Sequence, residues 1–197
     1  MKINSEILEV LKINNNMATT SQITEKGYSR ALLTKYVKAG LLERYRQGIY
    51  MLPEAVHDDM YTLMLRSENI IFSHDTALFL NGFSERTPFM HSVTIPSDKV
   101  LPASLKDECI CYYIKPELHK VGMTWKETTF GNRVRCYDAE RTICDLLRSR
   151  SRCDEETVLS AMKNYVKYKE RDLNRLANYS EQFRVRKVLN RYMEVLL

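Results

Sequence analysis

The chain has 197 residues, of which 44% are hydrophobic and 28% are charged, and its formal net charge is +5. This length suits one large domain or two small ones, and no stretch approaches the roughly 18 uninterrupted apolar residues that a membrane-spanning helix needs. The five cysteines are odd in number and form no CxxC pair, which argues against a disulfide framework and favours free, mostly buried thiols.

The N-terminal sequence MKINSEILEVLKINNN is polar and carries acidic residues in its first turns. It lacks the apolar stretch and the small-residue cleavage site of a signal peptide. We therefore expect a cytoplasmic protein.

Charge is segregated along the chain. Residues 1–52 carry eight Lys or Arg against four Asp or Glu, residues 53–130 seven against eleven, and residues 131–197 fifteen against ten, which gives +4, −4 and +5. A basic start and a basic end around an acidic middle indicate a polyanionic partner.

The first forty residues predict three short helices. Apolar residues recur at helical spacing from Ile3 to Leu11, a second helix spans about 20–26, and a third begins after the N-cap Ser29 and ends at Gly40. Two helices that meet at a tight turn outline a helix-turn-helix. Two strand-prone runs follow, 41–45 and 49–52, and they enclose a glycine turn, so the segment 1–53 is predicted to be a winged helix-turn-helix.

The remaining chain has a mixed pattern. We expect a linking helix within 54–68, and then a C-terminal α+β domain over 69–197 that ends in helices. Its expected strands are 69–72, 91–95, 110–114, 124–130 and 133–137, and its expected helices are 76–80, a region from Asp138, 155–168 and 181–196.

The third helix separates an apolar face from a basic face. Leu32, Leu33, Tyr36 and Val37 are expected to pack inward. The opposite face carries Arg30, Thr34, Lys35 and Lys38. A recognition helix in the major groove of DNA needs this division, although a solvated basic face or a protein-docking winged helix would share it.

The hairpin after this helix carries a second set of candidate contacts. Arg46 and Gln47 lie at its glycine tip, where a wing reaches phosphate or the minor groove. Arg44 is also a candidate, but strand alternation places it on the same face as Leu42, so its side chain can lie along the packed face instead.

No catalytic, cofactor or metal motif stands out. His74 lies beside Asp75 in FSHDTA, but adjacent residues at a helix start point in different directions. Capping of a helix by Ser73 or Asp75 explains the segment without a catalytic role. The other histidines are scattered, and no zinc, P-loop or dinucleotide-binding pattern occurs. We therefore expect no enzyme, no cofactor and no metal, while an enzyme acting on nucleic acid through His74 and Asp75 stays an alternative.

The last third of the chain interleaves basic and aromatic residues. Lysines and arginines from Lys163 to Arg191 alternate with tyrosines from Tyr165 to Tyr192. This composition is typical of RNA contact or a second DNA surface, and equally of ordinary amphipathic helices with half-buried tyrosines.

Several segments together resemble a known family. The winged helix ending RQGIYMLP, the segment FSHDTALFLNGFS, the strand VTIP and the helix start YDAERTICDLL occur in an order similar to that of the AbiEi antitoxins of type IV (abortive infection) toxin-antitoxin systems. The resemblance implies a phage-defence protein whose winged helix represses its own operon by binding inverted repeats in the promoter.

The same resemblance implies a C-terminal domain that counters a nucleotidyltransferase-like toxin without a stable complex, with RNA as a possible target. It implies DNA contacts at Arg30, Thr34, Lys35 and Lys38, and at Arg46 and Gln47 of the wing. No antitoxin surface follows from it. The alternatives are a stand-alone winged-helix regulator or a protein-docking module without antitoxin activity.

Overall fold

The structure is a computed structural model that describes residues 1–196. It contains two compact units. The first comprises residues 1–68 and 129–132, and the second comprises residues 69–128 and the chain from residue 133 onward. The expected α+β class with an N-terminal winged helix is confirmed.

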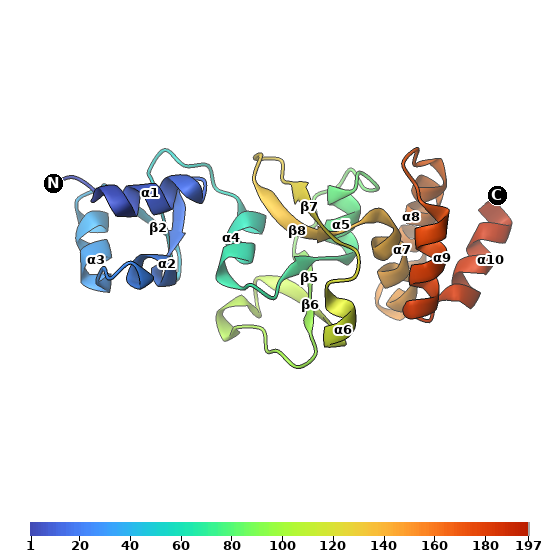
Figure 1. Ribbon diagram of the computed structural model, residues 1–197. Helices are drawn as coiled ribbons and strands as arrows, with labels where there is room; N and C mark the ends of the chain where they lie inside the picture. The colour runs from blue at the N-terminus through green and yellow to red at the C-terminus, as the bar shows by residue number, and fades with distance from the viewer. Residues whose placement is uncertain (197) are drawn as a thin grey trace. The chain divides into compact units, whose positions relative to one another are not determined.

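The first unit has the element order of a winged helix (Figure 1). Its elements are α1 (Ser5–Ile13), β1 (Met17–Thr19), α2 (Thr20–Glu25), α3 (Arg30–Lys38), β2 (Glu43–Arg46), β3 (Ile49–Met51) and α4 (Asp59–Arg66). The strands form an antiparallel sheet in the order β1-β3-β2.

Side-chain caps set the starts of these helices. The Asn4 side chain accepts the backbone N–H of Glu6, Thr19 and Gln22 form a capping box, and Ser29 accepts the N–H of Leu32. Each cap satisfies a backbone donor that the helix itself leaves unpaired. The caps therefore explain why α2 and α3 form as separate helices on either side of Gly27, whose φ is +85°.

The apolar faces of the three helices meet in one core with the sheet. Its buried members are Ile7, Leu11, Ala18, Ile23, Leu33, Tyr36, Leu42, Tyr50 and Leu52. Leu32 and Val37 pack against this core from its edge, so the expected inward face of α3 is correct.

Strand β1 was not expected from the sequence. Its three residues pair with β3, with Met17 opposite Met51 and Thr19 opposite Ile49. A run of this length carries no detectable period-two pattern, and only the pairing with the wing makes it a strand. The first wing strand also begins later than expected, at Glu43.

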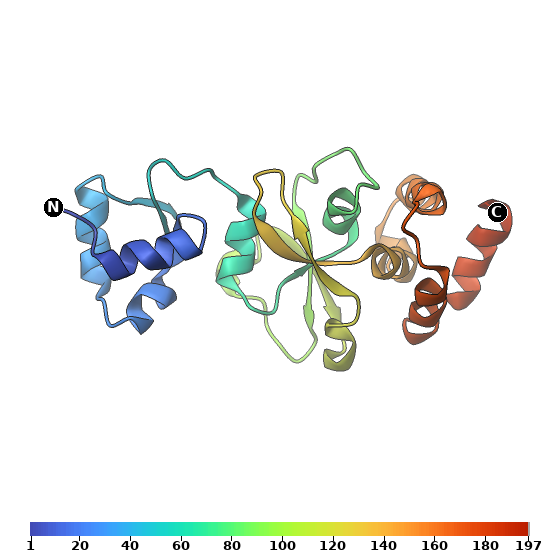
Figure 2. The same ribbon diagram turned by 45° about the horizontal axis from the view of Figure 1, so that its top comes forward.

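The second unit is built on a five-stranded mixed sheet flanked by helices (Figure 2). Its elements before the C-terminal helices are β4 (Ile71–Phe72), α5 (His74–Leu80), β5 (His91–Pro96), the 3-10 helix η1 (Ala103–Leu105), β6 (Cys109–Ile114), α6 (Pro116–His119), β7 (Met123–Glu127) and β8 (Arg133–Tyr137). The strand order is β6-β5-β4-β8-β7, with β5–β6 and β4–β8 parallel and the other two pairs antiparallel.

The helices after the sheet pack around α7, which lies between the sheet and the others (Figure 1). They are α7 (Ala139–Arg148), the 3-10 helix η2 (Arg150–Arg152), α8 (Glu155–Lys167), α9 (Leu173–Gln182) and α10 (Arg186–Leu196). The single helix expected over 181–196 is wrong at its start. Arg184 adopts a left-handed backbone with φ +59°. This conformation separates the end of α9 at Gln182 from the start of α10 at Arg186.

Arg141 on α7 is the largest fully buried side chain of the molecule. Its Nε donates to the Asp145 carboxylate at 3.0 Å, and its Nη1 donates to the carbonyls of Leu118 and Val121. The guanidinium carbon lies 3.9 Å from the ring centre of Tyr137 and 4.0 Å from that of Phe183. One buried cation therefore connects the turn after α6, the end of β8, α7 and the end of α9.

The glycine beside this cation offers a stability test. A Cβ at Gly122, where φ is +76°, would lie 2.6 Å from Cβ of Arg141, whereas a Cβ at Gly82, with φ +75°, would meet no atom within 4 Å. We expect Gly82→Ala to lower the free energy of unfolding by about 1–2 kcal/mol through backbone strain alone. Gly122→Ala should lower it by a further ~1–3 kcal/mol, because its methyl group overpacks against Arg141.

Urea denaturation of both variants and the unsubstituted protein measures these differences. Equal destabilisation by the two substitutions would show that the Gly122 approach to Arg141 does not constrain the fold.

Candidate nucleic-acid interface

Helix α3 presents an uninterrupted exposed face opposite its buried one. Arg30, Ala31, Thr34, Lys35 and Lys38 are all exposed. Tyr36 on the opposite face accepts the backbone N–H of Asn4 through its hydroxyl at 3.0 Å, which fixes α3 against the start of α1. The helix is therefore held by one side while the other stays free for a partner.

The cations of this face are not neutralised within the molecule. Among residues 1–196, no carboxylate forms an ion pair with Arg30, Lys35 or Lys38. A surface with three unpaired cations and no acid attracts a polyanion, because every charge of the partner meets charge of the opposite sign.

In the wing, the expected contact residue Arg46 is paired with a carboxylate. Arg46 is paired with Asp59 of α4 at 3.2 Å, and the Tyr45 hydroxyl donates to the same carboxylate. Burial and then the hydrogen bond to Asp59 raise the pKa of Tyr45 to about 12, so this hydroxyl keeps its proton. The guanidinium of Arg46 is thus partly neutralised.

Arg44 is the exposed cation of the hairpin that forms no ion pair in the described chain. It lies opposite Tyr50, next to a shift of the strand register between Arg44 and Arg46. Arg44 is exposed even though its cross-strand neighbour Tyr50 is buried. Gln47 is exposed at the tip, before Gly48 with φ +77°.

His74 does not contact its sequence neighbour in a catalytic arrangement. Its Nε2 lies 3.0 Å from the Ser149 hydroxyl, and its Nδ1 lies 3.0 Å from the Ser73 hydroxyl, which in turn accepts from Thr94. The ring is fully buried and stacks on Tyr112 with the ring centres 3.5 Å apart. Ser149 lies 75 positions away in the chain, so no local pattern reveals this contact.

A histidine between two hydroxyl groups resembles an activated serine, but the proton affinity argues against this role. Burial lowers the pKa of His74 to about 4, despite the opposing effect of nearby Asp145. A general base works best when its pKa lies near the working pH, and this ring lies roughly three units below neutrality. We interpret His74 as a neutral connector between the start of α5 and the end of α7.

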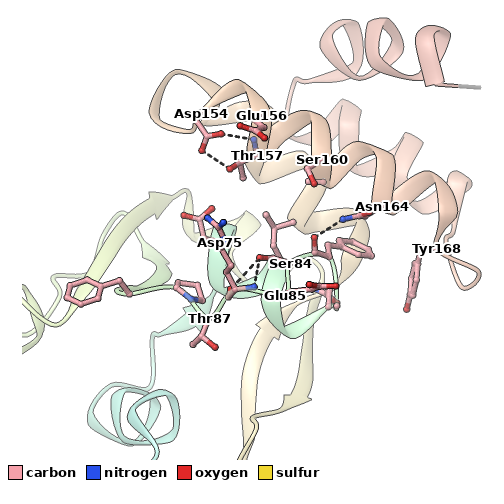
Figure 3. Close-up of a pocket in the computed structure, with 18 of the residues that line it drawn as sticks. Asp75, Ser84, Glu85, Thr87, Asp154, Glu156, Thr157, Ser160, Asn164 and Tyr168 are labelled. Atoms are coloured by element: carbon pink, nitrogen blue, oxygen red, sulfur yellow. Dashed lines mark hydrogen bonds between the residues drawn. The ribbon is translucent and has the colours of Figure 1, made fainter.

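A groove of about 1360 Å³ lies between α8 and the chain that follows α5 (Figure 3). Its apolar lining includes Leu78, Phe83, Phe89, Ile110 and Ala161. Its charged lining consists of Asp75, Glu85, Asp154, Glu156, Arg86 and Lys167. Carboxylates outnumber cations there, and Asp154 adds to the burial that raises the pKa of Asp75. This excess of negative charge disfavours phosphate in the groove.

The basic C-terminal helices divide into paired and unpaired cations. Arg175 contacts the carboxylates of Asp138, Glu140 and Asp172, and Arg186 contacts Glu181. The exposed cations without an ion pair in residues 1–196 are Lys163, Lys167, Lys169, Arg171, Arg184, Lys187 and Arg191.

The tyrosines among them mostly face the protein. Tyr165 is buried and donates to Glu140, and Tyr179 donates to Asp138. Because stacking on nucleic-acid bases needs an accessible ring, these two rings serve the fold instead.

Within the described chain, no group of three or more His, Cys, Asp or Glu side chains could hold a metal ion. No helix among residues 1–196 is both long and apolar enough to cross a bilayer.

Comparison with known proteins identifies the N-terminal segment. Residues 5–53 match the family described as "Transcriptional regulator, AbiEi antitoxin". This confirms the family resemblance for the winged helix, and the matched family is one of regulators and antitoxins rather than an enzyme class.

The fold has a counterpart among solved structures. The chain is similar to the crystal structure of the RV2827C protein from Mycobacterium tuberculosis, with a TM-score of 0.61, 14% sequence identity, and coverage of 90% of this chain and 70% of that chain. At this identity the likeness concerns the fold alone. No curated protein sequence matches the chain.

The buried neutral His74 predicts a pH dependence of stability. Below pH 6.5 the unfolded chain binds a proton at this ring, whereas the folded chain does not until about pH 4, so unfolding takes up a proton in this window. The His74 contribution to stability is complete above pH 6.5 and falls by about 3 kcal/mol as the pH drops to 4.

Asparagine is the suitable replacement, because the backbone at residue 74 has φ +47° and asparagine tolerates this region. Urea denaturation between pH 7 and pH 4.5 should show a shallower loss of stability for His74→Asn than for the unsubstituted protein. Parallel pH profiles would contradict a neutral buried ring.

Proposed function

We propose that the protein is a DNA-binding transcriptional autorepressor and antitoxin. Its winged helix, residues 1–53, binds inverted repeats in the promoter of its own operon. The observation that carries the proposal is the exposed face of α3, whose Arg30, Lys35 and Lys38 have no ion-pair partner within residues 1–196. The match of residues 5–53 to a family of transcriptional regulators supports the same reading.

The dimensions of α3 suit the major groove. Arg30 and Lys38 lie at its two ends, and eight residues of helix rise about 12 Å, which is close to the groove width of roughly 12 Å. The two end cations then reach phosphates on opposite sides of the groove. Thr34 and Lys35 lie between them and face the base edges, while Arg44 and Gln47 of the wing contact the adjoining backbone.

The C-terminal domain, residues 69–197, is proposed to counter a nucleotidyltransferase-like toxin without forming a stable complex with it. The family description of the winged helix as an AbiEi antitoxin supports this role. RNA contact by the unpaired cations of α8, α9 and α10 would involve phosphates more than bases, since Tyr165 and Tyr179 are turned toward Glu140 and Asp138.

A stand-alone regulator without antitoxin activity is the second candidate. It would bind DNA through the same face of α3. Expressed together with the toxin gene, it would leave the toxicity of that toxin unchanged. A protein-docking winged helix would instead show no salt-dependent binding to the upstream DNA.

Removing two cations from α3 tests DNA binding. In gel shifts with the DNA upstream of its own gene, Arg30→Ala with Lys38→Ala should weaken binding by at least roughly tenfold, since each cation loses a charge-assisted contact. The slope of log K against log salt should become shallower by about 1.8, because two phosphate contacts are lost.

The control is Lys106→Ala with Lys120→Ala, which removes the same charge from exposed positions of the second unit. It should leave affinity and slope close to those of the unsubstituted protein. If both pairs weaken binding equally, the effect comes from net charge and α3 is not the recognition helix.

The wing gives an independent prediction. Arg44→Ala should weaken DNA binding more than Arg46→Ala, because Asp59 already neutralises Arg46. Asp59→Asn should tighten binding, since it releases the Arg46 guanidinium and removes a negative charge. Fluorescence anisotropy with the same DNA ranks the three variants, and an Asp59→Asn variant that binds more weakly would contradict this account of the wing.

A further inference from the structure

The exposed face of α3 carries small side chains among its cations. Arg30, Lys35 and Lys38 supply the charge, whereas Ala31 and Thr34 are small exposed side chains. Residues three apart on a helix are neighbours on its surface, about 5–6 Å apart at Cβ. Ala31 and Thr34 therefore form one patch on the part of α3 that faces the partner.

The hydroxyl of Thr34 is already used within the helix. Its Oγ1 donates to the carbonyl of Arg30 at 3.3 Å. A hydroxyl has one hydrogen, so this donor is not available to a base while the bond is kept. Threonine carries two heavy atoms on Cβ, so with the hydroxyl hydrogen turned to the backbone, a partner can meet the methyl group and an oxygen that can only accept. The patch thus presents two methyl groups, one from Ala31 and one from Thr34.

The major groove contains one apolar group on its base edges, the C5-methyl of thymine. Contact between a methyl patch and the thymine methyl buries apolar surface and is favourable. Contact with the hydrogen-bond donors and acceptors of the other bases brings no such stabilisation. We propose that Ala31 and Thr34 select A·T base pairs by contact with thymine methyl groups at the centre of each half-site. This inference rests on the proposed DNA binding and deepens it.

Two substitutions separate the methyl from the hydroxyl. Thr34→Val keeps the shape and the methyl but lacks the hydroxyl, whereas Thr34→Ser keeps the hydroxyl and lacks the methyl. If the methyl reads the base, Thr34→Val binds like the unsubstituted protein and Thr34→Ser binds roughly fourfold more weakly, the loss expected for one buried methyl group. Hydroxyl readout predicts the opposite order.

The experiment measures affinity for two versions of the DNA upstream of the protein's own gene, one amplified with thymidine and one with deoxyuridine in its place. Deoxyuridine removes every C5-methyl and preserves base pairing. The unsubstituted protein and Thr34→Val should lose affinity on uracil DNA by at least about fourfold. Thr34→Ser should lose less affinity on uracil DNA, because this variant already lacks the protein methyl group of the contact.

Comparison between variants cancels any change that uracil causes in the DNA itself. Equal losses for Thr34→Ser and the unsubstituted protein, or equal affinity of the unsubstituted protein for both DNAs, would overturn the thymine contact and leave the proposed DNA binding intact. Absence of binding to the thymidine DNA would instead overturn the proposed function, and the thymine contact with it.

Discussion

The guanidinium of Arg141 lies between the rings of Tyr137 and Phe183, with none of its side chain exposed. A buried charge is costly unless it is paired and hydrogen-bonded, so the segments that supply its partners are held in place together. Asp145 supplies the opposite charge, and the carbonyls of Leu118 and Val121 accept two further bonds. The turn that carries Gly122 leaves no room for a side chain beside this cation. This one group therefore links α7, the end of α9, the end of β8 and the chain after α6, within an apolar core that packs the C-terminal helices together.

The arginines of the second unit and the cations of α3 differ in whether carboxylates pair with them. In the second unit, Arg141 and Arg175 meet carboxylates of the same unit, and these arginines connect helices. On α3, Arg30, Lys35 and Lys38 have no carboxylate partner in the described chain. Net charge along the sequence indicated a polyanionic partner for both ends of the chain. In the C-terminal helices, Arg175, Arg186, Tyr165 and Tyr179 are engaged with carboxylates of the same unit.

His74 illustrates how a polar cluster can resemble a catalytic site and still serve the fold. It contacts a serine hydroxyl at hydrogen-bond distance, yet its burial keeps the ring neutral and makes it a weak base. The left-handed backbone at this residue and the stacking on Tyr112 fit a connector that tolerates strain because its surroundings fix it. The adjacent Asp75 faces the groove instead and has a raised pKa.

The sequence by itself determined the features that depend on neighbouring residues. Helix caps at Ser29 and Asp138, the apolar face around Leu33 and Tyr36, and the glycine turn at Gly48 act within a few positions, and the structure has each of them. Tertiary structure alone decided what depends on distant partners: strand β1, the break at Arg184, the contact of His74 with Ser149, and the pairing of Arg46 with Asp59. A side chain's charge is written in the sequence, whereas its neutralisation depends on which distant carboxylate the fold brings within reach. For that reason the sequence predicted the face of α3, and only the fold distinguished Arg44 from Arg46.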